Sequence, residues 1–200
     1  MAALVYGLPA SAEPLRARTT ACSRYLREMT WTVPFPAPLA DGPLTGADRP
    51  ILAAFLDWQR TTMLNICAGL TAAQLVARPA PPSNLSLLGL VRHLTKVERI
   101  WFRQRAAGLP VPPVYDPAKG RDADFNDLDP DRAAADIALL AQEWRLSDAA
   151  VAGLAFDHTF SHGGENHSLR LVYVHMIAEY ARHNGHADLL RERIDGSTGR

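Results

Sequence analysis

Residues 169–190 restrict the fold of this chain most, because apolar side chains occur around most of the circumference that this segment would have as a helix. A helix of that kind is stable only where other elements surround it. Ser168 precedes the segment in the position of an N-cap, and Gly196 follows it where a helix would end. The sequence therefore predicts a long helix at the centre of a helical core.

Three further segments have the spacing of apolar residues that is typical of amphipathic helices. The first is expected to begin with Asp48 as its N-cap and to stop at Gly69. The second is expected to be capped near Ser86 and to stop at Gly108. The third begins at Asp129-Pro130 and carries an apolar stripe that ends in a tryptophan.

The segments between these helices are expected to be turns and loops. A short helical turn is expected after Thr71, and residues 110–127 form a connection that is rich in Pro and Asp. Residues 157–167 are polar and rich in Gly, which predicts a loop, and no segment alternates as a β-strand does. The sequence thus predicts an all-α fold, a four-helix bundle of the up-and-down type.

The first part of the chain differs from the rest. We expect residues 1–45 to be a largely irregular extension and residues 46–200 to be the bundle domain, because four prolines between residues 34 and 43 prevent a continuous helix. The first residues are apolar, but they lack a basic start and are interrupted by Gly and Pro, which argues against a signal peptide. Translation could start at Met29 instead of Met1.

Charge and cysteine usage exclude several classes of protein. The chain has 21 basic and 21 acidic side chains, so it carries no charge excess of the kind that binds nucleic acid or an anionic membrane. No apolar run reaches the roughly 20 residues that a membrane span needs. Cys22 and Cys67 are the only cysteines, and they form no CxxC motif, which favours a protein of the reducing cytoplasm.

A candidate metal site lies in the last long helix. Glu179 and His183 are four residues apart, so one helical face can direct a carboxylate oxygen and an imidazole nitrogen at the same point. The obvious third ligand is His93, which lies beside the apolar stripe of the second helix. Two histidines and one carboxylate leave a divalent ion with an open position, which is typical of catalytic sites.

Each of these residues also has a purely structural interpretation. A histidine beside an apolar stripe is often a hydrogen-bonded core residue, and Glu179 with His183 could be an ordinary i,i+4 pair. The apolar character of the last helix favours the metal, because a buried ionised carboxylate needs a compensating cation. His175, one turn before Glu179, could be an alternative ligand, a proton carrier or a partner that orients the ligands, and we favour the last. For His186 we expect a hydrogen bond to a neighbouring helix.

Four stretches of this sequence together resemble the actinobacterial branch of the DinB-like superfamily: residues 82–94, 97–102, 168–170 and 175–196. The similarity covers about residues 31–199. It implies a four-helix bundle with a metal ion between the second and fourth helices, held by a histidine of the former and an H-x3-H or E-x3-H pair of the latter. These positions are His93, Glu179 and His183 here. The Glu version is similar to the metal-binding domain of mycothiol-dependent maleylpyruvate isomerase, although this chain is too short for that enzyme's terminal domain.

The resemblance implies a metal-dependent thiol S-transferase or isomerase that uses mycothiol. A coordinated thiol loses its proton and becomes a nucleophile, whereas coordinated water at the same position would give a hydrolase. A bundle that binds a metal or a small molecule without catalysis is the third alternative. The ligand set suits zinc best and also accepts nickel or iron.

Arg92 and Arg182 flank the ligands and are candidates for binding the thiol cofactor. The expected partners are a small-molecule substrate and a low-molecular-weight thiol, and the chain could also form a homodimer.

Overall fold

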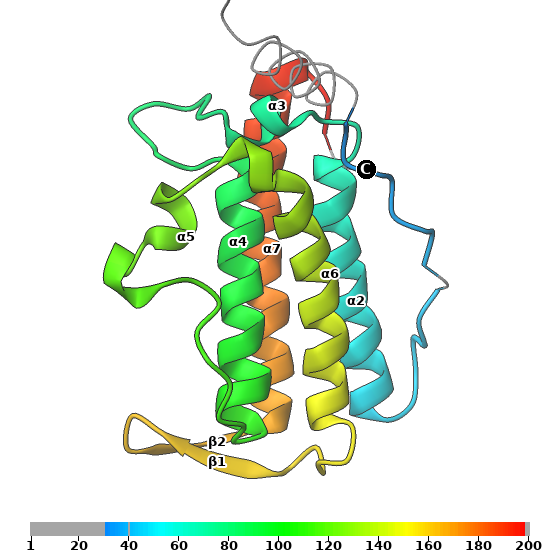
Figure 1. Cartoon of the computed structure of the whole chain (residues 1–200). Coiled ribbons are helices and arrows are strands. Elements are labelled where there is room, and N and C mark those ends of the chain that lie inside the picture. Colours follow the sequence, from blue (N-terminus) through cyan, green and yellow to red (C-terminus); the bar gives the residue numbers. More distant parts are fainter. Residues whose placement is uncertain (1–30, 40, 199–200) are drawn as a thin grey trace, which may run out of the picture. The chain divides into compact units, whose positions relative to one another are not determined.

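Four long helices run side by side in the computed structural model, which describes residues 31–39 and 41–198 (Figure 1). They are α2 (Asp48–Cys67), α4 (Leu87–Glu98), α6 (Ala133–Val151) and α7 (Leu169–Asp195). A π-helical segment, η1 (Arg99–Ala106), continues α4 without a break. The predicted four-helix bundle is therefore confirmed, with α7 as its longest helix. α7 is not at the centre of the core as expected, because one of its faces is open to solvent and exposes Leu171, Val174 and Leu189.

The helices do not alternate in direction along the chain, as the expected up-and-down type would require. α2 and α7 run the same way, since Arg170 near the start of α7 pairs with Asp48 at 3.0 Å, and Asn184 further along donates to the side chain of Gln59 at 2.7 Å. α4 and α6 both run the opposite way, because the connection between them returns along the bundle (Figure 1). α7 consequently lies antiparallel to α4, and this arrangement brings their central turns together.

The interior of the bundle is filled mainly by leucine, isoleucine, valine and methionine side chains. Four of them are completely buried on three different helices: Met63, Leu90, Leu94 and Met176. Burial of one such side chain contributes about 1.5–3 kcal/mol to folding. The periodicity that predicted the helices is thus the periodicity of this core.

One ion pair lies inside the same core. Arg60 of α2 donates from Nε and Nη2 to the two carboxylate oxygens of Glu98 of α4, each at 2.8 Å. Tyr180 of α7 donates its hydroxyl to Glu98 at 3.1 Å and accepts a hydrogen bond from Trp144 of α6 at 2.8 Å. One network of hydrogen bonds therefore joins all four long helices.

Short elements connect the long helices. The helical turn expected after Thr71 is α3 (Ala72–Val76), in which Thr71 and Gln74 form a capping box. The connection between η1 and α6 contains η2 (Pro117–Lys119), α5 (Ala123–Asn126) and η3 (Pro130–Arg132). α5 packs against α4, and this contact matters for the site described below.

A β-hairpin occupies most of the segment that was expected to be a loop, so the prediction that no strand occurs is wrong. Strands β1 (Thr159–His162) and β2 (Glu165–Ser168) pair in antiparallel register. Gly163 and Gly164 join them with φ values of 63° and 85°, which two-residue hairpin turns require. The strands contain too few apolar residues to show an alternating pattern, so the sequence feature that indicates the hairpin is the pair of glycines at its turn.

The predicted helix ends are confirmed at some positions and wrong at another. Ser86 and Ser168 accept hydrogen bonds from backbone N–H groups and cap α4 and α7, and Gly196 ends α7 with φ of 79°. Asp48, however, is the first residue of α2 and not its cap. Ala47 holds the cap position, and the Asp48 side chain is turned toward Arg170 instead.

The described residues from Thr32 onward form one compact unit. Thr32 forms a β-bridge with Thr71, and the backbone of the buried Val33 is hydrogen-bonded to Leu70 and Gly69 at 3.0 and 2.8 Å. From there to α2 the described residues contain no helix or strand. The expectations for residues 1–30, including the start at Met29, lie outside the described residues.

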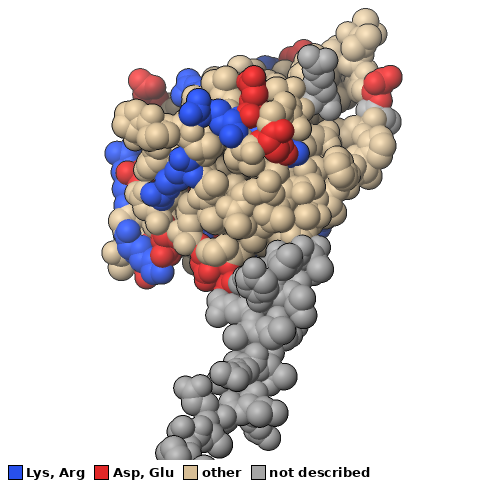
Figure 2. Space-filling model, turned by 90° about the horizontal axis from the view of Figure 1, so that it is seen from above, with Lys and Arg blue, Asp and Glu red and all other residues tan. Residues whose placement is uncertain are grey.

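Charged side chains of both signs lie next to each other on the end of the bundle that Figure 2 shows, and a broad part of this face carries none. This mixture agrees with the even charge balance of the sequence. None of the helices in the described part of the chain is long and apolar enough to cross a membrane.

Candidate metal centre

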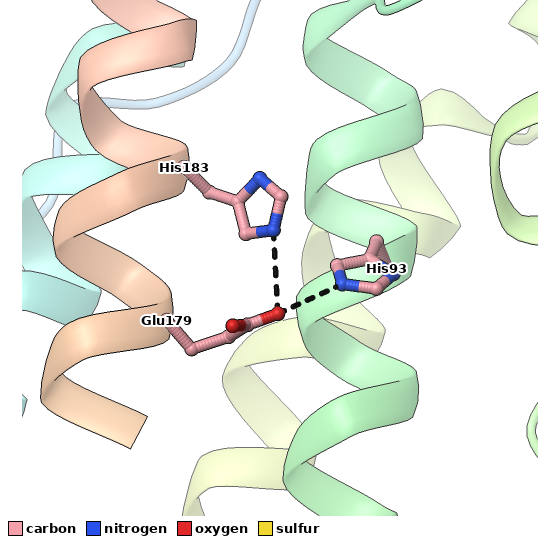
Figure 3. A group of neighbouring side chains, drawn as sticks. All are labelled: His93, Glu179 and His183. Atoms are coloured by element: carbon pink, nitrogen blue, oxygen red, sulfur yellow. Dashed lines mark hydrogen bonds and ion pairs between the residues drawn. The ribbon is translucent and has the colours of Figure 1, made fainter. Parts of the chain in front are cut away.

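His93, Glu179 and His183 converge between α4 and α7 (Figure 3). Oε1 of Glu179 lies 3.2 Å from Nε2 of His93 and 3.3 Å from Nε2 of His183. The i,i+4 spacing aligns Glu179 and His183 on one face of α7, and the antiparallel packing of α4 presents His93 to that face. One donor atom from each residue lies within 4.8 Å of the other two.

These distances fit the binding of a metal ion. Ligand atoms at 2.0–2.2 Å from a tetrahedral ion lie about 3.4 Å from one another, close to both separations measured from Glu179. The side chains of His93, Glu179 and His183 are 19%, 17% and 11% exposed, so the group is partly open to solvent. Three donors in a partly open group suit an ion that also binds a substrate.

Asp124 is part of this group although the sequence did not point to it. Its Oδ2 lies 2.8 Å from Nδ1 of His93, and the carboxylate is almost completely buried. An Nδ1–H group that donates to Asp124 leaves Nε2 of His93 to face Glu179 and His183. Asp124 belongs to α5, whose sequence is only one part of an Asp-rich connection, so no local signal distinguished this residue from its neighbours.

Two basic residues hold Asp124 in place. Lys96 donates to its Oδ1 at 3.1 Å, and Nε of Arg92 donates to its carbonyl oxygen at 3.1 Å. Burial would raise the pKa of Asp124, but hydrogen bonds from His93 and Lys96 lower it below its usual value. The carboxylate is therefore ionised at neutral pH and can accept the proton of His93 Nδ1.

The charges inside the group stabilise one another. Hydrogen bonds from His183 and His93 hold the pKa of Glu179 far below its usual value. Burial would lower the pKa of His93, but its hydrogen bonds to Asp124 and Glu179 outweigh this effect and raise it. The raised pKa of His93 favours a proton on the ring between these two carboxylates, and a bound ion would displace the proton on Nε2.

The other residues that the sequence singled out lie around this group. His186 contacts His183, with 3.4 Å between their Nδ1 atoms, so the expected hydrogen bond to a neighbouring helix is wrong. His175 lies against Trp101, with 4.4 Å between the ring centroids. Within the described part of the chain, no hydrogen bond joins His175 to Glu179.

The two candidate arginines differ sharply in environment. Arg92 is only 3% exposed, and its guanidinium binds Asp136 at 3.0 Å and stacks on Tyr115. Arg182 is exposed on α7, one turn from Glu179. The structure therefore brings together His93, Glu179 and His183, leaves Arg182 open to solvent beside them, and turns Arg92 into the protein.

The sequence was compared with known proteins. The profile of the family described as mycothiol-S-transferase matches residues 51–196, which include all four long helices except the first turn of α2. The chain belongs to the mycothiol-S-transferase family. No curated protein and no solved structure matches it significantly.

Membership of the mycothiol-S-transferase family assigns the activity that the resemblance implied. The protein is a mycothiol-dependent S-transferase, so its substrates are mycothiol and an electrophile. The match contains His93, Glu179 and His183, and it also spans Asp124. The thiol-transferase alternative is thus confirmed, and the next question is which residues carry the reaction.

Proposed function

We propose that this chain transfers the sulfur of mycothiol to an electrophilic carbon at the group formed by His93, Glu179 and His183, which would hold one divalent metal ion. The observation that carries the proposal is the convergence of three donor atoms within 4.8 Å from two helices. A bound divalent ion supplies positive charge that favours a thiolate over a thiol at neutral pH. In the transfer, the thiol would lose its proton to solvent, the sulfur lone pair would form the new C–S bond, and the bond from that carbon to its leaving group would break, with the electron pair departing on the leaving group.

The residues of the chain orient the reaction. Asp124 fixes the tautomer of His93 by accepting from Nδ1, so Nε2 presents a lone pair to the ion. Glu179 supplies the negative charge that two imidazoles lack. The exposed side of the group is where the thiol sulfur and the electrophile would approach one another, while the buried side excludes water.

Arg182 is our candidate for contact with mycothiol. It is exposed and lies one helical turn from Glu179. Within the described residues it forms no ion pair with any residue of the site. Arg92 was the other candidate, but its buried contacts with Asp136 and the carbonyl of Asp124 support a positioning role. We therefore assign Arg182 to the cofactor and Arg92 to the support of Asp124.

Several finer properties belong to the same proposal. Two imidazoles and one carboxylate suit zinc, which we favour, and also accept nickel or iron. Cys67 is buried with a free thiol, in agreement with a reducing cytoplasm. A homodimer remains a prediction that sedimentation of the purified protein would test.

Metal content and thiol transfer, measured on the same preparations, test the proposal. We expect the purified protein to contain close to one equivalent of a divalent metal, and the variants His93→Ala, Glu179→Gln and His183→Ala to lose it. Glu192→Gln is a matched control, because Glu192 is an exposed residue of α7 outside the group. Mycothiol-dependent consumption of an electrophile should fall with the metal content and should be restored when metal is added back to chelated wild-type protein.

Two results would contradict the proposal. Equal rates of thiol transfer with and without metal would show that the group does not activate the thiol. Rapid hydrolysis of esters or amides without any need for a thiol would instead favour the hydrolase that the same ligands could support.

A further inference from the structure

A cluster of aromatic and basic side chains lies at the hairpin end of the bundle. Its centre is Trp101 of η1, and the cluster consists of Trp101, Arg105, His162, His167 and His175. The ring of Trp101 lies 4.4 Å from that of His175, and the rings of His162 and His167 lie 6.1 and 6.3 Å away. The cluster thus joins η1, the hairpin and α7.

Among the described residues, the arginine of this cluster has no acidic partner. Arg105 places its guanidinium carbon 4.1 Å above the ring of Trp101, and within the described residues no carboxylate or carbonyl accepts from it. Its neighbours on the same helix behave differently, since Arg99 and Arg103 both bind the buried Glu143 at 2.7 and 2.8 Å. Burial lowers the pKa of Arg105, so this cation is partly desolvated, and among the described residues the face of Trp101 compensates it while no carboxylate does.

Charged groups of both signs lie near His175. Burial lowers the pKa of His175, Glu179 raises it, and Arg105 and Arg182 lower it, so the net direction is downward. Arg105, a half-buried cation that pairs with no carboxylate among the described residues, attracts an anion. The aromatic faces of Trp101 and His175 add a surface for a flat ring.

The cluster adjoins the metal centre. His175 precedes Glu179 by one helical turn, about 6 Å along the axis of α7, and Trp101 follows His93 by two turns on the facing helix. A ligand that reacts beside Glu179 would therefore reach the cluster if it spans about one aromatic ring. Arg182 lies on the other side of Glu179, where we place mycothiol.

We propose that the cluster selects the electrophile and that the preferred electrophiles are aromatic compounds with a carboxylate on the side of the ring away from the reacting carbon. The ring lies next to Trp101 and His175, and the carboxylate accepts from Arg105. This inference relies on the proposed function only for the position of the reacting carbon, because the binding of the anion needs no thiol.

Binding of an unreactive probe tests the site itself. We expect 3-nitrobenzoate to bind the full-length protein more tightly than 3-nitrobenzamide, which has the same ring without the charge. Arg105→Gln should weaken the binding of the benzoate about tenfold and leave that of the benzamide unchanged, because a charge-assisted hydrogen bond is lost. Arg145→Gln is the matched control, since Arg145 is an exposed arginine of α6 outside the cluster. Titration calorimetry measures all these affinities.

Catalysis gives a second readout. For 4-chloro-3-nitrobenzoate and its amide, the mycothiol sulfur bonds to the carbon that carries chlorine, chloride departs with the bonding electrons, and the thiol proton is released. We expect Arg105→Gln to lower kcat/KM for the benzoate relative to the amide about tenfold, and Trp101→Leu to lower both. Comparing the ratio of kcat/KM for the benzoate to kcat/KM for the amide between variant and wild type cancels the different intrinsic reactivities of the two substrates.

The outcomes separate this inference from the proposed function. Equal affinity of the wild-type protein for benzoate and benzamide, or an Arg105→Gln variant that binds benzoate as tightly as the control does, would overturn the inference. If the probes bind as expected while thiol transfer proves independent of metal, the cluster stands and the proposed function fails.

Discussion

Asp124 places a carboxylate oxygen 2.8 Å from Nδ1 of His93 and so determines which nitrogen of that ring faces Glu179. The two residues lie 31 positions apart and meet only because α5 packs against α4. A carboxylate behind a histidine ligand fixes the ring and increases the basicity of the nitrogen that binds the metal.

The first prediction follows from this contact. Asp124→Asn keeps the size of the side chain but removes its charge, so we expect the affinity for zinc to fall by about 10- to 100-fold while the helical content is unchanged. Competition with a chromophoric chelator measures the affinity. Asp122→Asn, at an exposed position that caps nothing through its side chain, should behave like the wild type. Unchanged affinity in the Asp124 variant would show that the contact has no role in metal binding.

The second prediction concerns the effect of metal on stability. An ion that binds only the folded protein stabilises it by about 2.7 kcal/mol at 100 times its dissociation constant. We therefore expect added zinc to raise the thermal midpoint of chelator-treated wild-type protein by several degrees, and not that of Glu179→Gln. Differential scanning fluorimetry measures both. The same rise in both proteins would indicate that zinc binds elsewhere.

The third prediction concerns the buried ion pair between Arg60 and Glu98. Glu98→Leu leaves the Arg60 cation buried without its main partner, so it should lower the free energy of unfolding by about 3–5 kcal/mol. The double variant Arg60→Met/Glu98→Leu removes both charges and should recover much of that loss. Urea denaturation measures the three proteins. A double variant less stable than Glu98→Leu would show that Arg60 contributes mainly through other contacts.

The fourth prediction concerns alkaline pH. Burial raises the pKa of the Cys67 thiol from 9.0 to about 12, so above pH 9 the unfolded chain releases this proton while the folded chain keeps it. Stability should therefore fall as the pH rises, by about 1.4 kcal/mol between pH 8 and pH 10 from this residue. The difference in this slope between the wild type and Cys67→Ala, from urea denaturation at each pH, isolates the effect. Identical slopes would mean that the folded protein ionises Cys67 as easily as the unfolded chain.

The fifth prediction locates the point where the N-terminal segment begins to matter. We expect deletion of residues 1–30 to leave the thermal midpoint nearly unchanged, because the sequence there shows no helical stripe. A deletion that also removes Val33 should lower the midpoint by several degrees. It removes a buried side chain, exposes the apolar residues beneath it, and breaks two backbone hydrogen bonds. A large loss from the shorter deletion would refute this boundary.

The sequence alone determined the local features of this protein. Helical periodicity predicted the four long helices, because a buried stripe repeats every three or four residues wherever the helix lies. The caps Ser86 and Ser168 could also be predicted from the sequence, because a cap bonds to the backbone of the residues that directly follow it. The pair of Glu179 and His183 is also local, because four residues of helix bring the two side chains together.

Only the tertiary structure decided which distant residues meet. The contacts of His93 with Asp124 and of Arg60 with Glu98 join residues 31 and 38 positions apart, and the parallel course of α4 and α6 arises from a connection whose path has no local signature. The cluster around Trp101 likewise depends on where the hairpin lies relative to α7. These contacts follow from how whole helices bury their apolar faces against one another, and that is a property of the packed chain and not of any single segment.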